Sequence, residues 1–147
     1  MAAGLTYLID PLGQIQKAND AKRKSDLEQL QRTLETYYND NGKYPDTTGS
    51  TVSPYYRLYP SSVSYDWDST WTAYNTKLPK DPSSTRNYVY YSTGQSYWIY
   101  ASLQRSSDPQ ACSGGAACSS LNGMGFPSAT SCGQTCNYGV SSPNTSP

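Results

Sequence analysis

The stretch that decides the fold is residues 12–45, LGQIQKANDAKRKSDLEQLQRTLETYYNDNGKYP. Its second half carries four apolar side chains three or four residues apart, at Leu27, Leu30, Leu34 and Tyr37. That spacing places them on one face of a helix. The Asn41-Gly42 pair, followed by Pro45, is typical of a helix C-terminus, because glycine adopts the left-handed cap conformation and proline cannot continue the helix. We therefore expect a helix that ends at Asn41.

The same spacing continues on the N-terminal side. A second group of apolar side chains lies at Leu5, Leu8, Leu12 and Ile15. Residues 16–26, between the two groups, are polar nearly all round the helix. A helix over residues 5–41 would be about 50 Å long, which is more than a compact domain of this size needs. We expect its first half to project and to pack against another molecule, with a kink or an opened turn at Pro11.

Residues 46–87 read mostly as a connection rich in Ser, Thr, Pro and Tyr. Within it, the spacing of Trp71, Tyr74 and Leu78 favours one short helix over residues 69–78.

The clearest strand signal follows, with aromatic and β-branched runs at residues 87–92 and 96–103 around the turn 92–95. Such a pattern predicts a β-hairpin. Alternation places Tyr97, Ile99 and Leu103 on one face, which we expect to pack on the second half of the helix. A third strand is expected at residues 137–140, because two strands alone are marginally stable.

Charge divides the chain of 147 residues. It has 11 basic and 11 acidic residues, all at or before Asp108, so residues 109–147 are uncharged. That uncharged region is rich in Gly and Ser and holds the four cysteines: Cys112, Cys118, Cys132 and Cys136. Their spacings are not those of zinc sites and there is no histidine, so two disulfides are favoured over a four-thiolate zinc cluster. Three pairings remain open.

Composition excludes several functions. The absence of histidine excludes Ser-His-Asp triads and histidine metal sites, and no GxSxG, Walker or GxGxxG pattern is present. We predict no enzyme, no cofactor and no metal. Zero net charge argues against nucleic acid as a main partner. The basic residues of 17–24 alternate with acids and are expected on a solvated or subunit-facing surface. Four aspartates are expected to be solvated turn and cap residues: Asp66, Asp68, Asp81 and Asp108.

The string 12–27 and the YYNDNGKYP exit at 37–45 resemble the bacterial type IV pilin and type II secretion pseudopilin family. The later WTAYNTKLPKDP at 71–82, followed by Tyr88-Val89-Tyr90, is similar to the middle section of the major pseudopilin. The resemblance implies an α+β fold, in which a long N-terminal helix packs on a small antiparallel sheet and an irregular C-terminal region is stapled by disulfides.

It also implies an organisation in three parts. Residues 1–45 form the helix, with 1–15 as the end of a filament-core or membrane segment and 27–42 packed on the head. Residues 46–108 form the connection and hairpin of the head, and residues 109–147 the C-terminal region. The expected head core is Leu27, Leu30, Leu34, Tyr37, Tyr97, Ile99 and Leu103. The expected filament-packing residues are Leu5, Leu8, Leu12 and Ile15.

The implied function is that of a structural subunit. We expect a pilin of a type IV pilus-like extracellular filament, which polymerises through its N-terminal helix and whose partners are its own copies and the assembly machinery. The resemblance also implies an inner-membrane stage through a hydrophobic segment, of which residues 2–9 look like the end, so we expect a truncated chain. The alternatives are a secretion pseudopilin and a minor pilin that binds surfaces or DNA. Family members often hold calcium in an acidic C-terminal loop, but no acidic residue follows Asp108.

Overall fold

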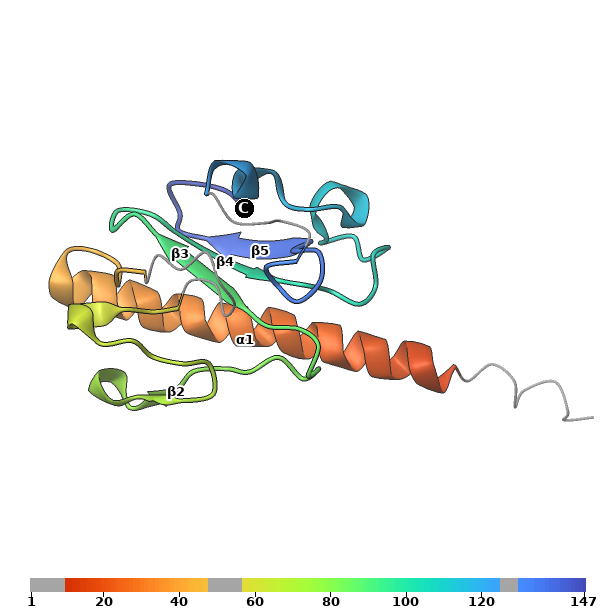
Figure 1. Ribbon diagram of the computed structural model, residues 1–147, viewed down its shortest axis with the longest axis horizontal. Coiled ribbons are helices and arrows are strands. Elements are labelled where there is room, and N and C mark those ends of the chain that lie inside the picture. The colour runs from red at the N-terminus through yellow and green to blue at the C-terminus, as the bar shows by residue number, and fades with distance from the viewer. Residues whose placement is uncertain (1–9, 48–56, 125–129) are drawn as a thin grey trace, which may run out of the picture.

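The computed structural model describes residues 10–47, 57–124 and 130–147. It confirms the α+β fold, with one long helix, two antiparallel sheets and a C-terminal region that contains two disulfides (Figure 1). The elements are, in order, α1 (Pro11–Asn41), η2 (Pro60–Ser62), β1 (Thr70–Trp71), η3 (Thr72–Tyr74), β2 (Thr76–Lys77), β3 (Val89–Ser92), β4 (Tyr97–Ala101), η4 (Cys112–Gly115), η5 (Ser119–Gly123) and β5 (Tyr138–Ser141).

Helix α1 begins at Pro11, so this proline is the first residue of the described helix and no kink is required of it. The side chain of Asp10 caps the helix by accepting the N–H of Gly13 at 3.1 Å. The expected helix residues 5–9 lie outside the described residues. At the other end, Gly42 adopts a φ of 72° and donates its N–H to the carbonyl of Tyr38, as the sequence predicts.

The predicted hairpin and third strand are confirmed. Strands β3, β4 and β5 form an antiparallel sheet in that order, in which Tyr91 lies opposite Trp98 and Ile99 opposite Val140. The turn between β3 and β4 contains Gly94, whose φ of 89° is easily reached only by glycine.

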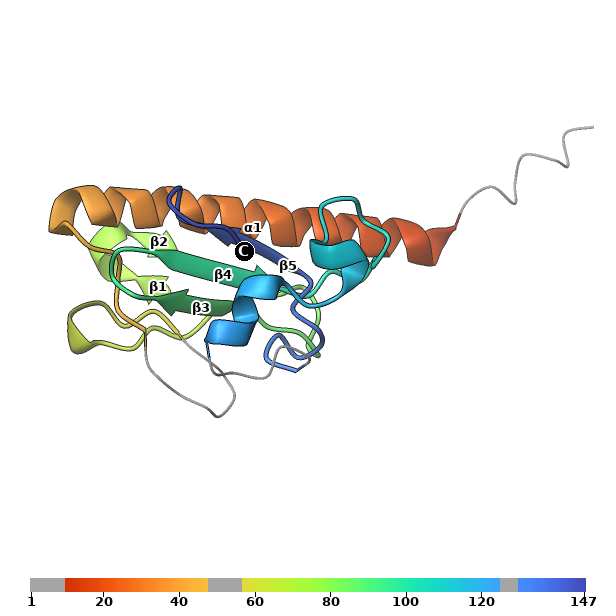
Figure 2. The same cartoon turned by 90° about the horizontal axis from the view of Figure 1, so that it is seen from above.

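One face of this sheet packs on α1 (Figure 2). The seven residues expected in the head core are all buried, from Leu27 and Leu34 at 0% exposure to Tyr37 at 7%. Tyrosines supply much of the rest of this core, in which Tyr44 packs edge-on against Tyr97 with ring centroids 4.6 Å apart. The core therefore joins helix and sheet through aromatic contacts as well as aliphatic ones.

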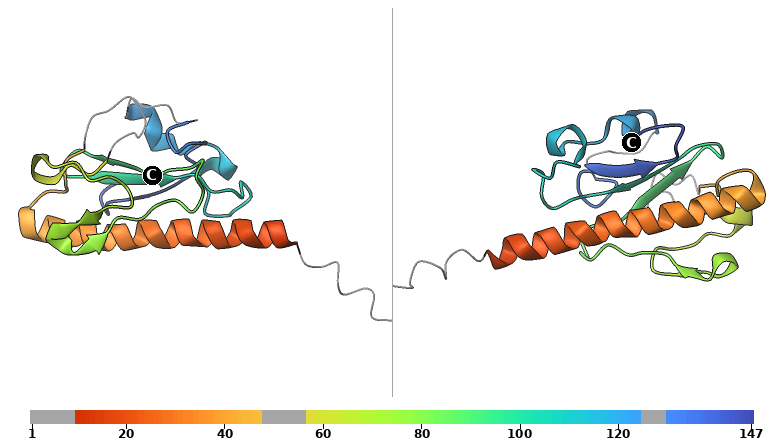
Figure 3. Two further views of the ribbon diagram at one scale, coloured as in Figure 1. Left: turned by 60° about the horizontal axis from the view of Figure 1, so that its bottom comes forward. Right: turned by 180° about the vertical axis from the view of Figure 1, so that it is seen from behind.

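The opposite face of the sheet is covered by the C-terminal region (Figure 3). Disulfides join Cys112 to Cys118 and Cys132 to Cys136, which is the nearest-neighbour pairing. Three of these cysteines are buried in a second core with Val89, Tyr100, Leu121 and Met124. The C-terminal region thus forms a third layer with a core of its own, which the sequence did not lead us to expect.

The short helix expected at 69–78 is wrong. Strands β1 and β2 pair in a small hairpin around the single turn η3, where Asn75 adopts the left-handed conformation at φ 45°. The β-branched Thr70 and Thr76 lose side-chain freedom in a helix, and each lies in one of the two strands. Trp71 and Leu78 are still buried against the head core.

Candidate assembly surface

The N-terminal end of α1 projects beyond the sheet (Figure 1). It carries exposed apolar side chains. Leu12 is 65% exposed and Ile15 is 57% exposed. Leu12 lies five helical turns before Leu30, so it continues the buried face of α1 past the point where the head ends. Leu5 and Leu8 lie outside the described residues. The apolar face of α1 is therefore longer than the head that covers it.

The polar segment of α1 is not solvated as predicted, because Arg23 is completely buried. Its guanidinium donates to both carboxylate oxygens of Asp81, at 2.7 and 2.8 Å, and to Asp20 at 2.8 Å and Gln104 at 3.2 Å. Burial lowers the pKa of Arg23, but the hydrogen bonds and charges of Asp81 and Asp20 outweigh it and hold that pKa above its ordinary value. Arg23 therefore stays charged and ties α1 to the loop that contains Asp81.

A second loop is attached to the same part of α1. The carboxylate of Asp20 accepts the backbone N–H groups of Gln104 and Arg105 at 2.8 and 3.0 Å. Lys24 pairs with the largely buried Asp108 at 2.7 Å. The expectation that Asp81 and Asp108 are solvated is thus wrong, because each neutralises a basic side chain of α1. Burial of α1 begins at Asp20, before the expected segment 27–42.

The ion pairs of this part of α1 cannot be predicted from the sequence, and the reason is physical. Arg23 and Asp81 are 58 residues apart, and no local pattern connects them. The helix start, in contrast, had a recognisable signal. An Asp followed by Pro is a common N-cap and first-turn pair, and it could have placed the helix start at Pro11.

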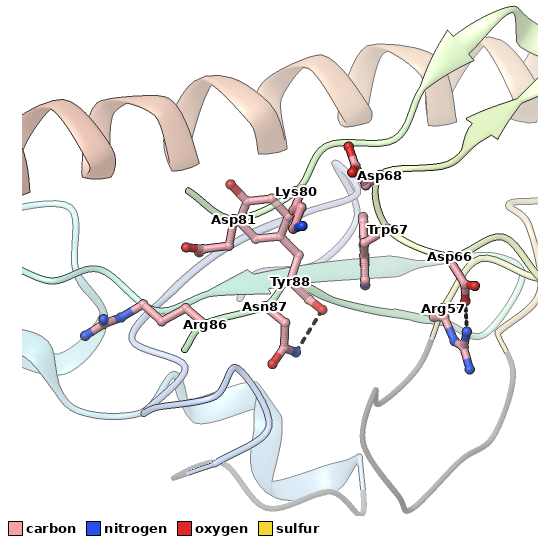
Figure 4. A pocket seen from close by; sticks show the side chains of 9 residues that line it. All are labelled: Arg57, Asp66, Trp67, Asp68, Lys80, Asp81, Arg86, Asn87 and Tyr88. Atoms are coloured by element: carbon pink, nitrogen blue, oxygen red, sulfur yellow. Dashed lines mark hydrogen bonds and ion pairs between the residues drawn. The ribbon is translucent and has the colours of Figure 1, made fainter. Parts of the chain in front are cut away.

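A cavity of about 430 Å³ lies between the loops on one side of the sheet (Figure 4). Its acids have basic partners: Asp66 pairs with Arg57, Asp68 with Lys77 at 3.0 Å, and Asp81 with Arg23. The amide of Asn87 donates to backbone carbonyls. Figure 4 shows the guanidinium of Arg86 directed away from the other lining side chains. These groups hold the loops together and do not converge on a common point.

Two further findings apply to the part of the chain that the structure describes. No cluster of three or more His, Cys, Asp or Glu side chains there is placed to hold a metal ion. No helix there combines the length and the apolar character needed to cross a membrane.

A model of the family of type II secretion system protein G matches residues 11–115, well over half of the chain. The chain belongs to this family. Its members are pseudopilins, which are pilin-like filament subunits, and the long helix with an uncovered apolar end fits that role. The match contains α1, β3 and β4, whereas most of the outer layer, the third layer formed by the C-terminal region, lies beyond residue 115. Neither the curated proteins nor the solved structures contain a significant match.

Proposed function

We propose that this pseudopilin is a structural subunit of the type II secretion filament and polymerises through the N-terminal part of α1. The observation that carries the proposal is the uncovered continuation of the buried face at Leu12 and Ile15, on a chain of the protein G family. Its partners are then further copies of itself and the secretion machinery. An inner-membrane stage before assembly belongs to the same proposal.

The physical basis is burial of apolar surface in a contact that repeats without closing. Complete burial of a leucine or isoleucine side chain contributes about 1.5–3 kcal/mol. Leu12 and Ile15 have more than half of their surface available, so each contributes about 1–2 kcal/mol when a neighbouring subunit covers it. A heterologous contact of this kind extends into a helical fibre instead of a closed oligomer.

The test is Ile15→Asp, with Gln14→Asp as the matched control. Both side chains are exposed in neighbouring positions of α1, but Ile15 lies one turn after Leu12 and beside the buried face, whereas Gln14 lies on the opposite side of the helix. Ile15→Asp is expected to abolish filaments in cells that express the secretion system, while Gln14→Asp retains them. Circular dichroism should show an intact head in both variants. Normal filaments from Ile15→Asp would contradict the proposal.

A cell-surface pilus is the second candidate, and it is favoured by the uncharged, disulfide-containing C-terminal layer. Such a layer suits a fibre that is exposed outside the cell. Antibodies against residues 130–147 distinguish the two filaments. They would label fibres on intact cells if this is an extracellular pilin, and would label only permeabilised cells if the filament stays in the periplasm.

A further inference from the structure

The loop that follows β4, residues 102–111, needs some contact or ligand to stabilise its conformation. The pseudopilin resemblance implies calcium in an acidic loop of the C-terminal region, and calcium takes six to eight oxygen ligands, several of them from carboxylates. In this chain Asp108 is the only acidic residue after Asp81. Its Oδ2 accepts from Lys24 at 2.7 Å and its Oδ1 from the N–H of Gln110 at 2.9 Å.

The neighbouring carboxylate is equally engaged. Asp20 accepts from Arg23 and Gln104 on one oxygen and from Arg105 on the other. A divalent cation at this place would face the ammonium of Lys24 and the guanidinium of Arg23, and it would have to displace both from their carboxylates. The residues present therefore do not fit a calcium site.

Covalent and backbone contacts close the loop instead. The Cys112–Cys118 disulfide forms a short ring that packs on residue 106, where a Cβ on Gly115 would lie 2.6 Å from the carbonyl oxygen of Ser106. The N–H of Cys112 donates to the carbonyl of Asn137 at 2.7 Å. The side chain of Asn137 in turn bonds both the N–H and the carbonyl of Leu103. The disulfide ring thus packs directly on residues 103–106, the segment whose backbone binds α1.

We propose that the Cys112–Cys118 disulfide, together with the Lys24 ammonium on Asp108, replaces a metal ion in this loop. Oxidation of the two thiols, and not calcium, then fixes the position of α1 against the loop. The path is short: the ring contacts Ser106, and the adjacent Gln104 and Arg105 hold Asp20 of the helix. The part of α1 around Asp20, which follows the exposed Leu12 and Ile15, is then held rigidly against the loop only in the oxidised protein. This inference does not depend on the kind of filament that the subunit forms.

The two disulfides differ in access. Cys112 is half-buried, whereas Cys118, Cys132 and Cys136 are all buried, so only the Cys112–Cys118 disulfide has a partly exposed cysteine. A dithiol reductant converts a disulfide to two thiols and is itself oxidised to a cyclic disulfide, and this exchange requires access to a sulfur. Mild reduction should therefore open Cys112–Cys118 first.

The experiment measures amide hydrogen exchange of Gln104 and Arg105 by NMR in the full chain. Calcium and a calcium chelator are expected to leave both exchange rates unchanged. Removal of the ring by C112A/C118A should raise both rates on the order of tenfold, because the backbone donors to Asp20 open locally. The matched control, C132A/C136A, removes the other disulfide and should leave them unchanged.

Two results would overturn the proposal. One is slower exchange or a higher Tm when calcium is added to the oxidised protein. The other is equal protection of Gln104 and Arg105 in C112A/C118A and in the C132A/C136A control. If C112A/C118A does not fold, Lys24→Met carries the test in the oxidised chain, and unchanged exchange of the two amides there would also overturn it.

Discussion

The strongest perturbation that the structure identifies is Arg23→Met. Methionine has a similar length and is apolar, so it fills the space of Arg23 while removing the positive charge and all four side-chain hydrogen bonds. The carboxylates of Asp20 and Asp81 then stay in the interior, at 2% and 0% side-chain exposure, without their cation. The cost comes from these two stranded charges rather than from lost packing.

Removing one partner of a buried ion pair costs about 3–5 kcal/mol, because the charge left behind is uncompensated. For a chain of this length the entropy of unfolding at Tm is about 0.3 kcal/mol/K, so the expected fall in Tm is about 10–15 °C. Lys22→Met is the control. Lys22 pairs with Asp26 one turn away at 2.6 Å, but it is half exposed, and its loss should cost about 0–1 kcal/mol.

The assay is thermal and urea unfolding, followed by near-ultraviolet circular dichroism of the packed tyrosines and tryptophans. The double variant R23M/D81N removes one of the stranded charges and keeps an oxygen for the N–H of Ser83. It should therefore be less destabilised than the sum of its single variants. The reasoning is refuted if Arg23→Met is no more costly than Lys22→Met, or if the double variant is simply additive.

Three further predictions follow from burial and backbone conformation. Gly133→Ala should lower stability by at least about 2 kcal/mol in urea unfolding, because φ is +79° there and a Cβ would lie 2.1 Å from the carbonyl oxygen of Thr85. Trp71→Ala should cost about 3–5 kcal/mol in the same assay, since the side chain is 1% exposed and fills the aromatic core. Burial and the carboxylate of Glu35 raise the pKa of Tyr44 to about 12, so its contribution to stability is complete below about pH 10 and is lost as the pH rises from 10 to 12. Urea midpoints measured across that range should fall less steeply in Tyr44→Phe.

The local sequence pattern was sufficient to predict those parts of the fold in which apolar residues recur with a single period, helical or strand. The helix face and the alternation of Tyr97, Ile99 and Leu103 each follow from a single repeat, and the sheet and core lie where these repeats place them. The exposed Leu12 and Ile15 also follow, because the same helical repeat continues beyond the head. What the pattern conveys is which face is apolar.

The remaining features depend on partners that are distant in the chain. Arg23 looks solvated in the sequence because Lys22 and Lys24 flank it, and Asp81 because it lies between prolines that predict a loop; only the fold brings the two charges together. The second core, in the C-terminal layer, could not be predicted from the sequence for another reason. Its members include Tyr100, which alternates away from the face of the strand that packs on α1, and cysteines, which bury as small apolar residues but follow no strand or helix period here.

Strand β4 separates two layers that are held by different chemistry. Ile99 faces the core shared with α1, while its neighbour Tyr100 faces the disulfide-containing layer. The family match contains the helix and both strands of the hairpin, and most of the outer layer lies beyond it. The proposed assembly surface on α1 and most of the chain beyond the family match therefore lie in different layers of the fold. Changes in the C-terminal region can reach α1 through the Cys112–Cys118 ring, which contacts the loop that holds the helix, and through β5, where the carbonyl of Ser141 accepts from the side chain of Gln31.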